Sequence, residues 1–283
     1  MKRSLATTAT EAREFLKGDR EAGNSIGLVP TMGFLHEGHL SLVRRAREEN
    51  DRCVVSIFVN PLQFGPSEDF NTYPRDLDRD LARLSSEGVD LVFAPGAEDM
   101  FWPDHSVIVS EKVLSGFLCG SARPGHFDGV CTVVLKLINI LHPDRAYFGE
   151  KDHQQLQVIR RMARDLDLEV EIVGCPIVRE KDGLAMSSRN TYLGDEERAQ
   201  AVALSRALAE ARSLFDAGER DSPSILAVIR KVVESYSLVS LEYAEVRDAD
   251  DLSPVERIGR KAVVALAARV GRTRLIDNGV LDP

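Results

Sequence analysis

The chain has 283 residues with 43% hydrophobic and 29% charged side chains, a composition typical of a globular enzyme with one large or two modest domains. Its net charge of −9 argues against a general nucleic-acid-binding protein, which would need a basic face. Charges interrupt every apolar run, and no apolar run follows Lys2 and Arg3, so we expect no membrane span and no signal peptide. The four cysteines are widely spaced without a Cys-x-x-Cys pair, which is typical of thiols in a cytoplasmic protein.

Strand-like and helix-like segments alternate over the first 175 residues. Short apolar runs predict strands at residues 26–29, 53–59, 91–94, 146–148 and 169–174. Apolar residues at helical spacing predict helices at residues 40–49, 76–87, 129–141 and 152–166. This alternation predicts an α/β fold over residues 1–175, with a Rossmann-like parallel sheet and helices on both of its faces.

The pattern changes after residue 175. Two helical patterns, at residues 196–216 and 224–237, are followed by strand-like runs at residues 241–246, 262–268 and 273–276. Helices followed by several strands in succession predict a smaller C-terminal α+β domain over residues 176–283.

Two histidines, His36 and His39, stand between the strand predicted at residues 26–29 and the helix that follows it. They are three residues apart, so they share one face of a helical start. Backbone N–H groups and the positive end of the helix dipole favour an anion here, and imidazoles beside them suit a phosphate. Gly38 between the two leaves room for a ligand to approach the backbone.

Two other interpretations of the histidine pair are open. A zinc-protease site would need histidines four residues apart, and no third metal ligand is close in sequence. Helix capping and core filling by both side chains is the purely structural alternative, although buried imidazoles without partners are costly.

Three further polar segments follow a predicted strand or the proposed domain boundary. Residues 58–65 carry Gln63, whose carboxamide offers a donor and an acceptor to a hydroxylated acid. Residues 147–155 carry Lys151, a charge that suits a phosphate contact. Residues 182–190 offer two hydroxyls and a guanidinium that could fold over a triphosphate. Taken one at a time, these segments are also compatible with a plain loop, a capped helix and a linker.

Together, and in this order, the four segments resemble the pantothenate synthetase family of pantoate–β-alanine ligases. Residues 30–39 resemble that family's version of the HIGH signature of adenylyl-transferring Rossmann enzymes, and residues 58–64 resemble its pantoate loop. Residues 148–155 resemble its nucleotide and pantoate segment, and residues 185–190 resemble the counterpart of the Lys-Met-Ser-Lys-Ser loop. The resemblance covers nearly the whole chain.

The resemblance implies ATP-dependent condensation of pantoate with β-alanine through a pantoyl-adenylate intermediate, giving pantothenate, AMP and pyrophosphate. It implies ATP as a substrate with Mg²⁺, a homodimer and a cytoplasmic enzyme. Neither a nucleic acid nor a membrane is expected as a partner.

The resemblance also implies a role for individual residues. It implies that six catalytic residues contact the ATP phosphates, namely His36, His39, Lys151, Ser187, Ser188 and Arg189. The rest of ATP is implied to lie against Met32, Gly149, Asp152, Val178 and Met186. Pantoate is implied to lie against Met32, Gln63 and Gln155.

Some residues and some functions are left open. Asp78 and Asp80 are candidates for the magnesium contact, which stays unassigned, and Arg123 is a weak candidate to face an acid or a phosphate. One alternative function is a nucleotidyltransferase that adenylylates a phosphate ester, although Gln63 and Gln155 favour a hydroxy acid. Another alternative is a nucleotide-binding regulatory module that performs no chemistry.

Overall fold

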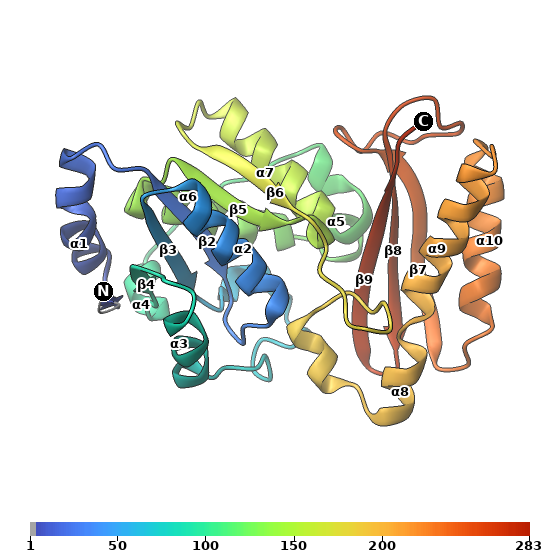
Figure 1. The fold of residues 1–283 in the computed structure, drawn as a ribbon, viewed down its shortest axis with the longest axis horizontal. Helices are drawn as coiled ribbons and strands as arrows, with labels where there is room; N and C mark the ends of the chain where they lie inside the picture. The colour runs from blue at the N-terminus through green and yellow to red at the C-terminus, as the bar shows by residue number, and fades with distance from the viewer. Residues whose placement is uncertain (1–3) are drawn as a thin grey trace.

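The computed structural model describes residues 4–283, so Lys2 and Arg3 lie outside the described residues. Its first half contains a six-stranded, fully parallel sheet with strand order β1-β4-β3-β2-β5-β6 (Figure 1). The strands are Ser4–Ala6 (β1), Ile26–Thr31 (β2), Arg52–Ile57 (β3), Leu91–Phe93 (β4), Arg145–Gly149 (β5) and Glu171–Cys175 (β6). Central strands β2 and β3 are almost wholly buried, as expected of strands covered on both faces.

Helices cover both faces of this sheet. Ala9–Glu21 (α1), His126–Leu141 (α6) and His153–Asp165 (α7) contribute to one apolar core, and Glu37–Glu49 (α2) and Leu77–Ser85 (α3) contribute to the core on the other face. The shorter helical segments are Pro61–Gln63 (η1), Ala97–Met100 (α4), Leu114–Gly116 (η2), Leu118–Ala122 (α5) and Glu150–Asp152 (η3). The Rossmann-like fold predicted from the alternation of elements is therefore confirmed.

The C-terminal part of the chain forms a second, antiparallel sheet. Its strands are Val239–Asp248 (β7), Ala262–Val270 (β8) and Thr273–Leu281 (β9), in the order β7-β8-β9. It is preceded by Ser188–Tyr192 (η4), Asp195–Gln200 (α8), Ala203–Asp216 (α9) and Ser222–Glu234 (α10). Helices α9 and α10 cover its outer face, while Val263 and Tyr243 pack into the core of the parallel sheet (Figure 1). The predicted smaller α+β unit is confirmed as a part of the fold.

Two predicted features differ in detail. The helix predicted at residues 196–216 is divided between α8 and α9 by a turn at Ala201 and Val202, although both residues keep right-handed backbone angles. Both residues stay buried, as they would in one continuous helix, so the apolar pattern does not reveal the break. Elements β1 and α1 were not predicted, since β1 is three residues long and α1 buries only two side chains.

Across residues 4–283, none of the helices combines the length and the apolar character that a membrane-spanning helix requires. All four cysteines are buried and free of disulfide bonds. The strand order reverses between β2 and β5, and ligands of open α/β sheets bind at the carboxyl ends of strands at such a switch point.

Candidate active site

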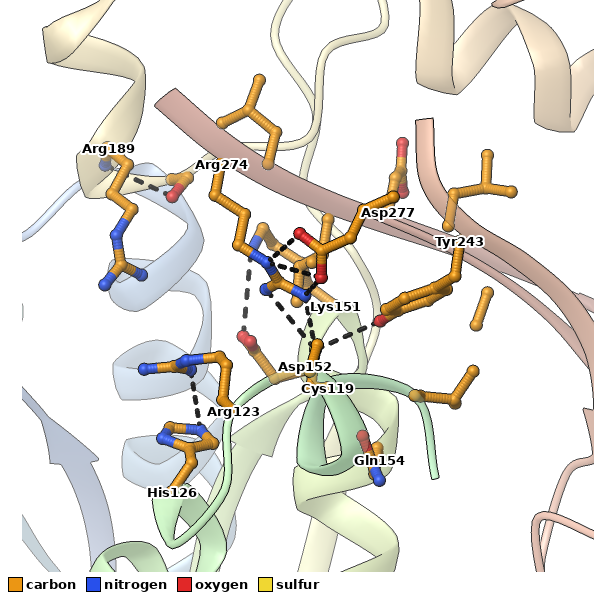
Figure 2. Close-up of a pocket in the computed structure, with 18 of the residues that line it drawn as sticks. Cys119, Arg123, His126, Lys151, Asp152, Gln154, Arg189, Tyr243, Arg274 and Asp277 are labelled. Carbon is orange, nitrogen blue, oxygen red and sulfur yellow. Dashed lines mark hydrogen bonds and ion pairs between the residues drawn. The ribbon is translucent and has the colours of Figure 1, made fainter. Parts of the chain in front are cut away.

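Two connected cavities lie at this switch point and between the two sheets. The first, of about 240 Å³, opens at the ends of β2 and β5, and we call it the switch-point cavity. The second, of about 660 Å³, lies between the parallel sheet and β7–β9, and we call it the inter-sheet cavity. Figure 2 shows Lys151 and Arg123 of the first half facing Arg274 and Tyr243 of the second sheet across it. Both cavities are lined by Lys151, Asp152 and Arg189, so they form one cleft.

All thirteen residues predicted for the site line the switch-point cavity. They come from five separate parts of the chain, namely Met32, His36, His39, Gln63, Gly149, Lys151, Asp152, Gln155, Val178, Met186, Ser187, Ser188 and Arg189. The fold therefore brings together every residue that the four motifs singled out. Their individual roles stay predictions.

The two histidines stack at the start of α2. His36 is the residue that precedes the helix, and its backbone N–H donates to Nδ1 of His39 at 3.3 Å. The ring centroids are 4.0 Å apart. Because Nδ1 of His39 accepts a hydrogen bond, the neutral imidazole carries its proton on Nε2, where it is available to a ligand. A Cβ on Gly38 would lie 2.9 Å from the His36 ring, so glycine there makes room for this ring, and Gly38 also lines the switch-point cavity.

Both imidazoles are neutral at pH 7. Burial, and after it the positive charge of Lys151, lowers the pKa of His36 to about 4. Burial and the neighbouring His36 lower the pKa of His39 well below its ordinary range. Atom Nδ1 of His36 is buried and has no hydrogen-bond partner among the described residues. The pair can therefore offer neutral N–H donors to a ligand, while Lys151 and Arg189 bring positive charge to the same cavity.

The pH dependence of the free energy of unfolding should reflect the neutral state of His36. The folded pKa of His36, about 4, lies below the ordinary 6.5, so its contribution to stability is complete above pH 6.5 and is lost as the pH falls from 6.5 towards 4. We expect the stability difference between the wild type and His36→Gln to be constant above this window and to shrink within it. Urea unfolding of both proteins at a series of pH values measures this difference, and parallel pH profiles would contradict it.

A buried carboxylate shapes the loop that carries the histidines. Asp80 of α3 is 1% exposed and accepts hydrogen bonds from the backbone N–H groups of Phe34 and Leu35 at 2.6 and 2.7 Å. Burial raises the pKa of Asp80, against the effect of these two hydrogen bonds. Gly33 and Phe34 both have positive φ, so the loop adopts a sharp turn that needs such support. Asp80 is thus engaged in loop structure and lines neither cavity, which argues against it as the magnesium contact.

Gln63 is held by its neighbours with its carboxamide in the cavity. Its Oε1 accepts from Nδ2 of Asn60 at 3.1 Å, and its Nε2 lies 3.0 Å from Sδ of Met32. Asn60 is 1% exposed and also donates to the carbonyl of Gly129 at 3.0 Å. A Cβ on Gly129 would lie 2.3 Å from the carbonyl oxygen of Leu62, so only glycine lets η1 rest directly on α6.

Arg123 and His126 hold the main chain of Gln63, a role that sequence reasoning missed. The carbonyl of Gln63 accepts from Nδ1 of His126 at 2.8 Å and from Nη2 of Arg123 at 3.2 Å. Arg123 also donates to both oxygens of Glu68 at 2.6 and 2.7 Å, and to Nε2 of His126 (Figure 2). Burial opposes ionisation of Glu68, but Arg123 outweighs it and lowers the pKa of Glu68 to about 2. The Gly-rich approach to α6 was the available signal.

The residues at the end of β5 and just after it face open space. A Cβ on Gly149 would meet no described atom within 4 Å, so the cavity is free to receive a ligand against this backbone. Lys151 lies partly buried with Nζ 3.9 Å from Oδ2 of Asp152 (Figure 2). Gln155 lines both cavities, and its side chain forms no hydrogen bond within residues 4–283. These groups are placed for contacts with a ligand rather than with the protein.

The predicted nucleotide loop is anchored in this structure. The Oγ of Ser188 donates to the carbonyl of Phe34 at 3.2 Å, and the Oγ of Ser187 accepts from the backbone N–H of Arg189 at 3.3 Å. The guanidinium of Arg189 donates to both oxygens of Asp69 at 2.8 Å. Asp69 was not predicted, because it lies 120 residues away in a loop with no distinctive pattern.

Within residues 4–283, no group of three or more His, Cys, Asp or Glu side chains is arranged to hold a metal ion. Mg²⁺ in nucleotide sites is held largely by phosphate oxygens and water, with one or two carboxylates. The half-exposed carboxylate of Asp152, beside Lys151, fits such a minor contribution.

Comparisons with known proteins agree with this geometry. The family model described as pantoate-beta-alanine ligase matches residues 4–280. A pantothenate synthetase from Thermotoga petrophila is 57% identical over 277 residues, which cover 98% of this chain and 99% of that protein. One from Thermosipho melanesiensis is 59% identical over 256 residues, covering 90% and 91%.

Solved structures give the same result. A pantothenate synthetase structure from Thermus thermophilus has a TM-score of 0.95 at 46% identity, covering 99% of this chain and 100% of that one. A pantoate-beta-alanine ligase from Francisella tularensis, solved with Beta-gamma ATP and Beta-alanine, has a TM-score of 0.83 at 33% identity, covering 99% and 98%. The chain therefore belongs to the pantoate–β-alanine ligase family.

Proposed function

We propose that the cleft at the switch point is where this ligase condenses pantoate with β-alanine. The pantoate carboxylate attacks the α-phosphorus of ATP, giving pantoyl adenylate and pyrophosphate. The amine of β-alanine then attacks the acyl carbon, and AMP leaves as pantothenate forms. The convergence of all thirteen predicted residues on one cavity supports this placement. The complex of the Francisella ligase with Beta-gamma ATP and Beta-alanine supports the same two ligands here.

Pantoate lies against Met32, with its hydroxyl and carboxylate groups facing Gln63 and Gln155. The carboxamide of Gln63 is oriented by Asn60, and its main chain by His126, so this group is preorganised before the substrate arrives. The attack needs no deprotonation, because pantoate is already a carboxylate at neutral pH. Orientation is therefore the main task of these residues.

ATP lies along Gly149, Asp152 and the main chain of Val178, with its phosphates towards the histidine pair. Neutral His36 and His39 donate hydrogen bonds to phosphate oxygens, and Lys151 stabilises the negative charge that grows at the α-phosphate. The hydroxyls of Ser187 and Ser188 are bonded to backbone groups rather than to a base, so neither is an activated nucleophile. The reaction therefore proceeds by direct attack.

Mg²⁺ bound with ATP would neutralise charge on the phosphates. The residues present fit an ion carried in by the nucleotide, with Asp152 as the protein carboxylate in reach of it. The chain's own task is then to hold the triphosphate in line with the pantoate carboxylate.

Residues 182–190 form the segment that we expect to close over the nucleotide. Their turn-rich sequence has few apolar anchors, of which Leu184 and Ala185 are buried. Hydrogen exchange across residues 187–189 should slow when ATP is added, because bound phosphates give these groups further partners. Exchange in α10 should not change and serves as the internal control. Equal exchange with and without ATP would contradict closure.

The decisive experiment is incubation with ATP, pantoate and β-alanine, followed by assay of AMP and pantothenate. ATP–pyrophosphate exchange that depends on pantoate separates the ligase from a nucleotidyltransferase that acts on a phosphate ester. Absence of substrate-dependent AMP release would favour a binding module instead.

Assembly, location and domain division complete the proposal. Trp102, Val107 and Val113 are 74%, 78% and 57% exposed, and exposed apolar residues within one segment of the chain support a homodimer, which sedimentation velocity tests. The free cysteines support a cytoplasmic location.

We place the domain boundary between residues 175 and 176, where β6 ends, and limited proteolysis tests this division.

A further inference from the structure

Two adjacent polar residues of β9 reach out of the second sheet into the active site. Asn278 is 5% exposed, and its Nδ2 donates to the carbonyl oxygens of Glu150 at 2.9 Å and Lys151 at 2.8 Å. Asn278 thus holds the backbone of the segment that carries Lys151. Asn278 and Lys151 lie 127 positions apart, Asn278 on β9 of the second sheet and Lys151 on η3, which follows β5 of the parallel sheet.

The preceding residue holds the other side of the cleft. Asp277 is 3% exposed and accepts hydrogen bonds from Nη1 and Nη2 of Arg179 at 2.7 and 3.0 Å. Arg179 also donates to the carbonyl of Gly183 at 3.0 Å. Arg179 follows Val178, whose carbonyl accepts from the backbone N–H of Met186 at 3.0 Å. Asp277 therefore fixes the start of the nucleotide loop.

The burial of two polar side chains, those of Asp277 and Asn278, needs a physical reason. A buried carboxylate and a buried carboxamide are costly unless they are fully hydrogen-bonded, and this pair directs its bonds to other elements at the nucleotide site. Segment η3, which contains Lys151, is only three residues long. A single 3₁₀ turn has few hydrogen bonds of its own, so its position depends on outside partners such as Asn278.

We propose that Asp277 and Asn278 are positioning residues, through which the second sheet sets the geometry of the nucleotide site. Asn278 fixes the backbone from which Lys151 reaches the α-phosphate, and Asp277 fixes the loop that receives the adenine and the phosphates. This inference rests on the role proposed above for Lys151. Both side chains spend their hydrogen bonds on these segments, so both act through the segments that they hold.

A matched pair of variants tests the role of Asn278. Asn50 is 8% exposed, and its Nδ2 also donates twice, to the carbonyl of Ala46 and to Oη of Tyr147, at the opposite edge of the sheet. Asn278→Ala and Asn50→Ala therefore remove the same group and should lower thermal stability similarly. Only Asn278→Ala should slow adenylate formation, by about 10- to 100-fold, because small misplacements of a catalytic group have effects of this size. Equal rates in the two variants would overturn the inference.

A double variant shows whether Asn278 acts through Lys151. If it does, Asn278→Ala combined with Lys151→Ala should form adenylate no more slowly than Lys151→Ala alone, because the positioned group is already absent. Multiplied defects would overturn the inference. A Lys151→Ala enzyme with a normal rate would instead refute the role proposed for Lys151, which separates the two failures.

Asp277→Asn provides a second test that keeps the shape of the side chain. It removes the charge that pairs with Arg179, so the Michaelis constant for ATP should rise about 10-fold, with that for pantoate unchanged. If Asn278→Ala does not fold, Asp277→Asn still tests whether these residues of β9 position the nucleotide site. Equal changes for both substrates would point to a general structural defect and would overturn the assignment.

Discussion

Replacing Lys151 by alanine is expected to slow the formation of pantoyl adenylate by about 10²- to 10³-fold. The ammonium group lies at the end of β5, facing the cavity into which the histidine pair also points. Negative charge grows at the α-phosphate as the carboxylate attacks, so this contact strengthens in the transition state. Substrate binding should fall less than the rate, since the gain is concentrated in that state.

Single-turnover measurements of each half-reaction test this assignment. The second half-reaction, started from pantoyl adenylate and β-alanine, needs only the departure of AMP, so it should depend less on the triphosphate contacts of His36 and His39. Alanine variants of either histidine should likewise slow mainly the first half-reaction. Lys231→Ala, on the exposed side of α10, is the matched control and should be unaffected. A normal rate of adenylate formation in Lys151→Ala would refute the role given to that residue.

Replacing Gln63 or Gln155 by alanine is expected to raise the Michaelis constant for pantoate well above any change for ATP. A buried polar group left without its partner costs about 1–3 kcal/mol, which corresponds to about 5- to 150-fold in affinity. We expect the larger effect at Gln63, because its removal also leaves Nδ2 of Asn60 without one acceptor. The side chain of Gln155 has no such protein partner among residues 4–283, so its removal breaks only its hydrogen bonds to the ligand.

Steady-state kinetics with each substrate varied in turn measure this difference. Gln154→Ala is a suitable control on the same helix, because Gln154 does not line the switch-point cavity and donates to the carbonyls of Leu114 and Phe117. It should leave the Michaelis constant for pantoate unchanged. If pantoate affinity is unaltered in both Gln63→Ala and Gln155→Ala, the assignment of the pantoate site is wrong.

Much of the site could be predicted because its signals are local. A strand that ends in a glycine- or histidine-bearing turn before a helix is recognisable from about a dozen residues, and parallel strands bring such turns to one edge. The motifs around His36, Gln63 and Lys151 were found at such strand ends, the motif around Ser187 was found as a polar loop after the domain boundary, and all four converge on one cavity. The contact between Gly38 and the His36 ring could not be predicted, because the position of that ring depends on its side-chain rotamer.

The sequence by itself determined the alternation of strands and helices, the change of pattern near residue 175 and the turns that carry the chemistry. Periodicity and turn residues are properties of neighbouring positions, so they can be read along the chain. Only the tertiary structure decided that Asp80 supports the histidine loop, that Arg123 holds Gln63, and that Asn278 holds the backbone of Lys151. These contacts join residues 46, 60 and 127 positions apart. They depend on how whole elements pack against one another, and no local pattern encodes that packing.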